Sequence, residues 1–272
     1  MAPDEFYVGY LPKAPSGVAG VVRRVVVGLW VLSVLVAVVG AAMQRSPGTA
    51  VWGDAVVTKA GMLVVKPYPM LLVGADDGSV RTVLLVNPGK CGLVPSGDFC
   101  GPREGAEEAL RTLSKLDHQM VQVRGTVLER DGREMVELAD GLSSVKEAVG
   151  EQWRGFPRGG TGPVWKGHFN VRGTIVDSKC YMGAMKPGEG KVHRDCAVRC
   201  VLGGVPPVLV TRDANGAAAY YLLTDSRGEV DKETWASLAD DRVDVDGELD
   251  MIGDIGILAV NRVRCVDGTR QE

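Results

Sequence analysis

An internal repeat constrains the fold of this 272-residue chain more than any other feature. Residues 120–128, MVQVRGTVL, match residues 242–250, RVDVDGELD, at a constant offset of 122. The same offset pairs Gly125 with Gly247 and runs without a gap from Leu113, opposite Trp235, to Leu138, opposite Val260. Self-similarity at a fixed offset indicates a repeated structural unit, so the sequence predicts two copies of one domain.

Each copy is expected to contain three strands, a helix and two strands, because alternating β-branched residues surround one segment with helical apolar spacing. In the first copy the expected strands are residues 62–66 with 69–73, 80–86, 119–129 and 134–138, and the helix is 106–116. In the second copy the strands are 169–176, 208–211, 218–224, 242–249 and 256–263, and the helix is 232–238. This order is that of an OB-type barrel. Another small β-barrel, or a sandwich with a helix, is the alternative.

The fold class is therefore predicted as mainly β, with a single N-terminal transmembrane helix followed by two tandem OB-like β-barrel domains, each with one helix. The expected division is 1–20, a short cytoplasmic strip; 21–43, the transmembrane helix; 54–149, the first OB-like domain; and 163–272, the second OB-like domain with a Cys-rich insertion. Residues 44–53 and 150–162 are expected to be linkers. The first copy carries an insertion at 87–105 and the second at 178–205, and such loops often carry specific function.

Residues 25–42, VVVGLWVLSVLVAVVGAA, contain no charge and would span about 27 Å as a helix, close to the thickness of a bilayer core. Arg23 and Arg24 precede this run. Basic residues favour the cytoplasmic side, which predicts a single-pass protein of the inner, cytoplasmic membrane. The N-terminus would lie inside and the C-terminal domains would be periplasmic or extracytoplasmic. A cleaved signal peptide is the alternative, but the apolar run is long for one.

The predicted partners are the lipid bilayer and membrane protein subunits, and not nucleic acid. Net charge is −3 for the whole chain, with 31 basic and 34 acidic side chains, and no basic stripe suits a phosphate backbone. The segment before the apolar run is rich in aromatic residues that favour membrane interfaces or a neighbouring subunit. The predicted partner-contact residues are Phe6, Tyr7 and Tyr10.

All six cysteines are expected to form disulfides, because an extracytoplasmic space is oxidising. Cys91 and Cys100 form the natural pair in the first copy, while Cys180, Cys196, Cys200 and Cys265 remain in the second. Cys196 and Cys200 are four apart, so on a helical turn one suits Cys180 and the other Cys265. No cofactor is predicted. The alternative is a zinc or copper site, whose candidate ligands are Cys180, His193, Cys196 and Cys200.

These residues carry a family resemblance. Residues 177–180, DSKC, then 193–200, HRDCAVRC, then Gly203 and Gly204, resemble a bacterial exported OB-like domain family of unknown function with the pattern D-S-x-C, H-x-x-C-A-x-x-C and a glycine pair. The resemblance covers the second copy only. The last cysteine spacing is one residue longer here. The resemblance implies an OB-like fold and no activity.

The sequence predicts no enzyme, since it contains no Gly-rich phosphate loop and no G-x-S-x-G or H-E-x-x-H motif. Asp240 and Asp241 are expected to be solvated turn residues. Three functions remain. The first is an accessory or structural subunit of a larger membrane complex, respiratory or redox in character. The second is an extracytoplasmic small-ligand or metal-binding module, and the third is a thiol-redox protein.

Overall fold

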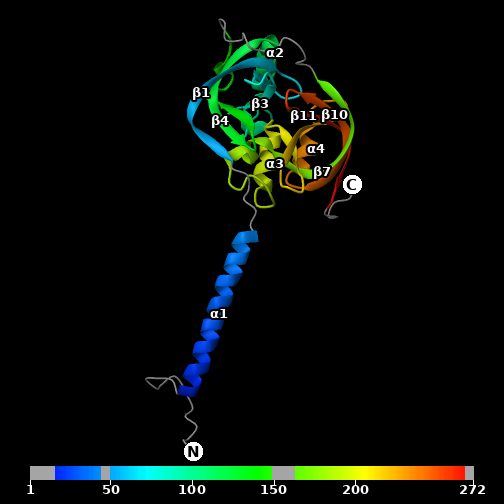
Figure 1. Ribbon diagram of the computed structural model, residues 1–272. Coiled ribbons are helices and arrows are strands. Elements are labelled where there is room, and N and C mark those ends of the chain that lie inside the picture. The colour runs from blue at the N-terminus through cyan, green and yellow to red at the C-terminus, as the bar shows by residue number, and fades with distance from the viewer. Residues whose placement is uncertain (1–15, 44–49, 149–162, 267–272) are drawn as a thin grey trace, which may run out of the picture. The chain divides into compact units, whose positions relative to one another are not determined.

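The computed structural model describes residues 16–43, 50–148 and 163–266 (Figure 1). It divides into two compact units, one ending at Pro47 and one beginning at Gly48. The predicted contact residues Phe6, Tyr7 and Tyr10 and the predicted linker 150–162 lie outside the described residues.

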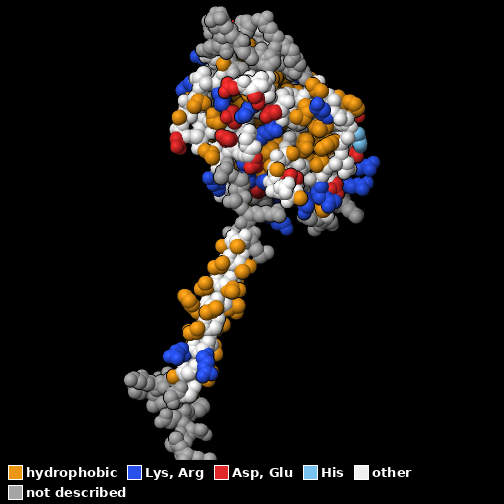
Figure 2. Space-filling model, viewed as in Figure 1, with side chains coloured by type: hydrophobic (Ala, Val, Ile, Leu, Met, Phe, Trp, Pro, Cys, Tyr) orange, Lys and Arg blue, Asp and Glu red, His pale blue; other side chains and the backbone are white. Residues whose placement is uncertain are grey.

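The described part of the first unit is one helix, α1 (Ser16–Met43). Its segment Gly17–Ala42 is long and apolar enough to cross a membrane, and its side chains are not buried against other parts of the protein. Apolar side chains cover the visible face of α1, with basic side chains near one end (Figure 2). The predicted apolar helix is confirmed, but it begins at Ser16, so the last residues of the predicted strip are helical.

The second unit contains two closed sheets with the same order of strands. In the first, β1 (Val51–Val64), β2 (Met70–Gly74), β3 (Val80–Val86), β5 (Arg133–Leu138) and β4 (Met120–Arg130) pair in that order. β1 also pairs with β4, which closes the ring. The short strand β6 (Val145–Glu147) pairs with Val121, Gln122 and Val123 of β4. We call this sheet barrel 1. The helix α2 (Arg103–Leu116) lies in the chain between β3 and β4.

Barrel 2 is closed by β7 (Val164–Asp177), β8 (Pro207–Arg212), β9 (Ala218–Asp225), β11 (Ile255–Cys265) and β10 (Arg242–Ile252). Its third and last strands, β9 and β11, run parallel, as β3 and β5 do in barrel 1. The helix α4 (Lys232–Ser237) precedes β10. A second helix, α3 (Arg194–Leu202), lies in the insertion between β7 and β8 and was not predicted as an element.

The glycines in register explain why the repeat is visible in the sequence. An ideal Cβ on Gly125 would lie 2.2 Å from the carbonyl oxygen of Glu137, and one on Gly247 would lie 2.2 Å from that of Ala259. Both glycines face the strand that follows them, with Gly125 opposite Leu138 and Gly247 opposite Val260. A side chain at either position would therefore collide with the backbone of its neighbour.

The two barrels share a buried joint. Each barrel has its own apolar interior, and a further core cluster contains residues of both, among them Tyr68 and Leu72 of barrel 1 and Tyr220 and Ile257 of barrel 2. The Tyr68 hydroxyl donates to the Leu223 carbonyl at 2.6 Å, and the Thr82 hydroxyl donates to the Ile252 carbonyl at 2.7 Å. The barrels were predicted as separate domains, but the joint makes them one compact unit.

The two insertions meet at this joint. The amides of Gly92 and Ser96 both donate to the Gly203 carbonyl, at 2.9 and 3.1 Å. The Ser96 hydroxyl donates to the Leu202 carbonyl at 2.6 Å. The insertions were expected to carry specific function. In the structure the backbone contacts of Gly92 and Ser96 with Gly203 join the two insertions and bring their side chains together.

Candidate thiol and metal site

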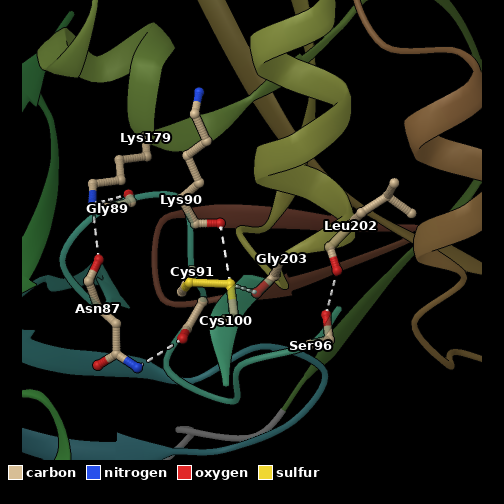
Figure 3. The surroundings of a disulfide bond; sticks show 10 residues. Asn87, Gly89, Lys90, Cys91, Ser96, Cys100, Lys179, Leu202 and Gly203 are labelled. Atoms are coloured by element: carbon tan, nitrogen blue, oxygen red, sulfur yellow. Dashed lines mark hydrogen bonds between the residues drawn. A yellow bond between two sulfur atoms is a disulfide. The ribbon is translucent and has the colours of Figure 1, made fainter. Parts of the chain in front are cut away.

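A disulfide shapes the insertion of barrel 1. Cys91 and Cys100 are bonded, with sulfur atoms 2.01 Å apart, which confirms the predicted pair (Figure 3). The bond closes the loop that follows β3 and holds it against Gly203 of the other insertion. Closing a loop of this size removes conformational freedom from the unfolded chain, a stabilisation of about 2–3 kcal/mol.

Cys180, Cys196 and Cys200 are thiols that converge at the joint. Cys180 begins the short helical turn η3 (Cys180–Ala184), which is separated from the end of β7 by two residues, and its amide donates a hydrogen bond to Asp177 Oδ1 at 2.8 Å. Cys196 and Cys200 lie one turn apart on α3, as their spacing predicted. The helical turn η3 and one face of α3 thus supply the three sulfur atoms.

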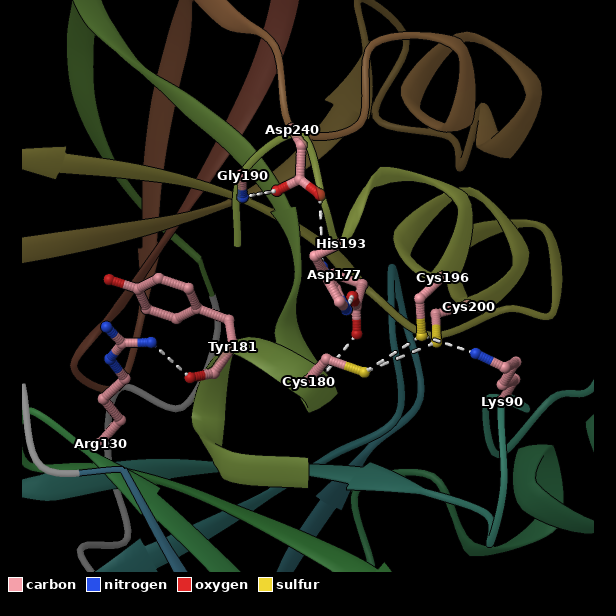
Figure 4. A network of polar contacts seen from close by, with 10 residues as sticks. All are labelled: Lys90, Arg130, Asp177, Cys180, Tyr181, Gly190, His193, Cys196, Cys200 and Asp240. Atoms are coloured by element: carbon pink, nitrogen blue, oxygen red, sulfur yellow. Dashed lines mark hydrogen bonds and ion pairs between the residues drawn. The ribbon is translucent and has the colours of Figure 1, made fainter. Parts of the chain in front are cut away.

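The sulfur of Cys180 lies 3.9 Å from that of Cys196 and 3.9 Å from that of Cys200. All three sulfur atoms lie within 4.8 Å of one another. Cys180 and Cys200 are buried and Cys196 is half-buried. In Figure 4 the side chain of Cys180 points from one side toward the Cys196 and Cys200 sulfurs.

Lys90 approaches this cluster from the insertion of barrel 1. Its Nζ lies 2.6 Å from the Cys196 sulfur, and it is half-buried (Figure 4). The contact with Cys196 raises the pKa of Lys90, which keeps the amine positively charged. The positively charged amine of Lys90 therefore lies next to the three thiols.

A buried acid–imidazole chain lies on the other side of Cys180. His193 Nδ1 is 3.2 Å from Asp240 Oδ2, and His193 Nε2 is 3.5 Å from Asp177 Oδ2. The side chains of both acids are 0% exposed. Asp177 Oδ2 and His193 Nε2 are buried atoms without a hydrogen-bond partner. Ligand atoms of Asp177, Cys180 and His193 form a second group within 4.8 Å of one another.

Burial and charge set the protonation of these groups. Burial raises the pKa of Asp177 above its usual range, because the charged carboxylate is poorly solvated there. Burial lowers the pKa of His193, but its hydrogen bond to Asp240 and the charge of Asp177 outweigh that effect and raise it overall. The hydrogen bond to Cys200, followed by burial, raises the pKa of Cys180 far above that of an ordinary thiol. Cys180 is therefore a neutral thiol unless a cation stabilises its thiolate.

Two further buried cations fix the joint around the cluster. Lys179 is 3% exposed, donates to the Asn87 and Gly89 carbonyls at 2.8 and 2.6 Å, and pairs with Glu137 (Figure 3). Arg130 of barrel 1 donates to the Tyr181 carbonyl at 2.8 Å, and its guanidinium lies 3.8 Å from the centre of the Tyr181 ring. Both contacts connect barrel 1 with the segment that carries Cys180.

The structure brings together the four predicted metal candidates, Cys180, His193, Cys196 and Cys200, at one place in the joint. His193 approaches Cys180 and Asp177 rather than joining the three sulfurs as a single group. Cys265 ends β11 and packs against the core of barrel 2. The predicted disulfides of Cys180, Cys196, Cys200 and Cys265 are not formed in the structure, and their pairing stays a prediction.

The sequence reasoning missed Lys90, Asp177 and Asp240. The expectation of a solvated Asp240 is wrong, because its carboxylate is buried, accepts from the Gly190 amide at 3.0 Å and faces His193. Asp241 beside it pairs with Arg194. Lys90 offered no signal, since its partner is 106 residues away. Asp177 stood in the quoted DSKC motif, and its place at a strand end next to cysteine was the available clue.

Comparisons of the chain with protein-family models, curated proteins and solved structures found no match. The resemblance to an exported OB-like family therefore stays a prediction.

Proposed function

We propose that this protein is a membrane-anchored, extracytoplasmic metal-binding module in which Cys180, Cys196 and Cys200 hold one zinc or copper(I) ion. The observation that carries the proposal is the convergence of the three sulfur atoms within 4.8 Å of one another. Thiolates are ligands that both cations accept in proteins. Two helical elements, η3 and α3, position the three thiols, and two of these thiols are buried.

The surroundings supply what a metal–thiolate site needs. Three thiolates carry three negative charges, a zinc ion offsets two of them, and the ammonium of Lys90 offsets the third at 2.6 Å from Cys196. Nδ1 of His193 faces Asp240, while its Nε2 is buried without a hydrogen-bond partner and lies 3.5 Å from Asp177 Oδ2, an arrangement that suits a metal-binding imidazole. Asp177 and His193 are thus the candidates for a fourth ligand of tetrahedral zinc, and copper(I) would use the sulfurs alone.

We also propose that the two sheets are OB-like barrels and that α1 crosses the membrane once. The common strand order, closed by the first and fourth strands and with parallel third and last strands, supports two OB-like barrels. The uncharged run 25–42 within α1, with Arg23 and Arg24 directly before it, supports one crossing of the cytoplasmic membrane, with the N-terminus inside and the barrels outside. In an oxidising space, a bound metal would also protect three neighbouring thiols from disulfide formation.

The test is the metal content of the full chain, purified in mild detergent from cells supplied with zinc and copper. We expect about one ion per chain. The variants Cys180→Ser, Cys196→Ser and Cys200→Ser should each lose most of it. Cys265→Ser is the matched control, because Cys265 lies at the end of β11 and outside the cluster, and it should keep the metal. Metal-free wild-type protein with a disulfide inside the cluster would contradict the proposal and support the thiol-redox alternative.

A second candidate is the accessory subunit of a larger membrane complex. Its support is the apolar surface at the starting ends of the two long first strands, where Trp52 of β1 is 41% exposed and Trp165 of β7 is 67% exposed. Aromatic residues contribute strongly to protein interfaces. Native-gel migration after mild detergent extraction tests this candidate. A stable assembly that weakens when Phe6, Tyr7 and Tyr10 are replaced by alanine would support it, and a lone 28.9 kDa species would contradict it.

A further inference from the structure

The contact between Lys90 and Cys196 is much closer than the other sulfur contacts at this joint. Nζ and Sγ are 2.6 Å apart. The Cys100 sulfur meets carbonyl oxygens at 3.7 and 3.8 Å, and the Cys180 sulfur meets its neighbours at 3.9 Å. A hydrogen bond to nitrogen or oxygen already needs about 2.7–3.2 Å, and sulfur is a larger atom. The separation is therefore shorter than an ordinary hydrogen bond to sulfur.

One oxygen atom placed between nitrogen and sulfur explains this separation. Two single bonds of ordinary length that meet at a near-tetrahedral angle hold their outer atoms about as far apart as Nζ and Sγ are here. A direct nitrogen–sulfur bond would be far shorter. We infer that Lys90 and Cys196 form a covalent nitrogen–oxygen–sulfur bridge, and that this site is an oxidant-driven crosslink between the two barrels.

The position of the pair suits such a modification. Both residues are half-buried, whereas Cys180 and Cys200 are buried, so a small oxidant reaches Cys196 first. Oxidation of cysteine favours exposed thiols in electropositive surroundings, which Lys90 provides. The disulfide of Cys91, the residue next to Lys90, holds its loop in place, and Lys179 fixes the same loop through two carbonyls. The amine is thus held beside the thiol.

The chemistry balances with hydrogen peroxide as the oxidant. One peroxide oxidises the Cys196 thiol to a sulfenic acid and leaves as water. A second peroxide takes one hydrogen from the Lys90 amine and one from the sulfenic acid, so that nitrogen and the sulfenic oxygen join and two further waters form. In total two peroxides are reduced, the thiol and the amine are oxidised together by four electrons, and three waters leave. The crosslink needs no metal, and it is an alternative to metal binding, because a bridged Cys196 could no longer be a ligand; the crosslink therefore belongs to the metal-free, oxidised protein.

The test is peptide mass mapping of the full chain in mild detergent, stripped of metal with a chelator, reduced and then treated with hydrogen peroxide. We expect a crosslinked species that contains Lys90 and Cys196 and whose mass is the sum of both peptides plus one oxygen and minus two hydrogens. A thiol reductant should release it. Lys191→Arg changes an exposed lysine in the insertion that carries Cys196. This control variant should give the same yield of the crosslink as the wild type.

Lys90→Arg keeps the positive charge but removes the reacting amine. In this variant the bridge should disappear, and Cys196 should instead form a disulfide with Cys180 or Cys200, whose sulfurs are its nearest remaining partners. An unmodified Lys90 in peroxide-treated wild-type protein, with Cys196 in a disulfide or further oxidised, would overturn the inference. A link that lacks the oxygen mass would overturn it as well, since that product is a direct nitrogen–sulfur bond.

Discussion

At the scale of single residues, Lys179 places a charge where water hardly reaches it. Its ammonium satisfies the carboxylate of Glu137 and two backbone carbonyls of the insertion in barrel 1. Replacing Lys179 by methionine would leave the buried Oε2 of the half-buried Glu137 without its ammonium partner. Because an uncompensated buried charge is costly, we expect Lys179→Met to lower the free energy of unfolding by about 3–5 kcal/mol.

The control for this change is Lys66→Met. Lys66 pairs with Glu229 at 4.0 Å, but its side chain is 80% exposed, so its removal should cost about 0–1 kcal/mol. Urea unfolding of the full chain in detergent, followed by tryptophan fluorescence, measures both values. Equal effects of the two substitutions would show that Lys179 does not stabilise the joint.

His193 should make the stability depend on pH. Its overall pKa is raised above 6.5, the value expected for the unfolded chain. A raised pKa in the folded state contributes stability that is fully present below 6.5 and is lost as pH rises through the folded-state pKa. We expect the free energy of unfolding of metal-stripped, reduced protein to fall above about pH 6.5. His193→Gln should lack this fall, and identical slopes in both proteins would contradict the role of the Asp177–His193–Asp240 chain.

At the scale of elements, the two insertions depend on glycines for their close approach. An ideal Cβ on Gly203 would lie 2.1 Å from the Lys90 carbonyl oxygen, which is fixed backbone. Gly203→Ala should therefore separate the insertions and destabilise the protein by about 1–3 kcal/mol. Gly105→Ala is the matched control in α2, where nothing lies within 4 Å, and it should stabilise the helix by about 0.5–1 kcal/mol. Thermal unfolding of both variants checks that the two substitutions change stability in opposite directions. Equal shifts in melting temperature would contradict the close contact of the two insertions.

Elements with a strong hydrophobic periodicity can be predicted from the sequence, whereas elements whose position depends on distant contacts cannot. β4 and β10 are visible as a pair because both keep the same alternation and the same glycine, Gly125 and Gly247, against the next strand. The helix α3 is short and carries two cysteines and two arginines, so its apolar period is weak. Its position is set by packing against α4 and by the backbone contact of Gly92 with Gly203, which no local pattern announces.

The same distinction applies to the candidate site. The three clustered cysteines and His193 were visible as potential ligands because their residue types are few in the sequence. Their convergence was not visible, because it depends on how η3 and α3 pack at the joint. Asp240 adopts a positive φ of 59°, which fits its predicted place in a turn, but the turn folds its carboxylate inward to His193. Turn chemistry predicts the backbone there and not the burial of the side chain.

At the scale of the whole molecule, the membrane topology is open to a direct test. Arg23 and Arg24 precede the uncharged run 25–42 of α1, so we expect the barrels to lie outside the cytoplasm. A reporter enzyme that is active only after export, fused behind Glu272, should be active. A cytoplasm-specific reporter at the same position should be inactive. Replacing Arg23 and Arg24 by glutamine should weaken the orientation, and activity of the cytoplasmic reporter in the wild type would contradict it.

In the function proposed for this protein, the joint between the barrels is built around a metal–thiolate site. X-ray absorption at the metal edge of the purified full chain tests it most directly, because the first shell reports the kind and number of ligand atoms. For zinc we predict three sulfur ligands at about 2.3 Å and one nitrogen or oxygen ligand at about 2.0–2.2 Å. For copper(I) we predict sulfur ligands alone. A first shell of nitrogen and oxygen without sulfur would contradict the claim.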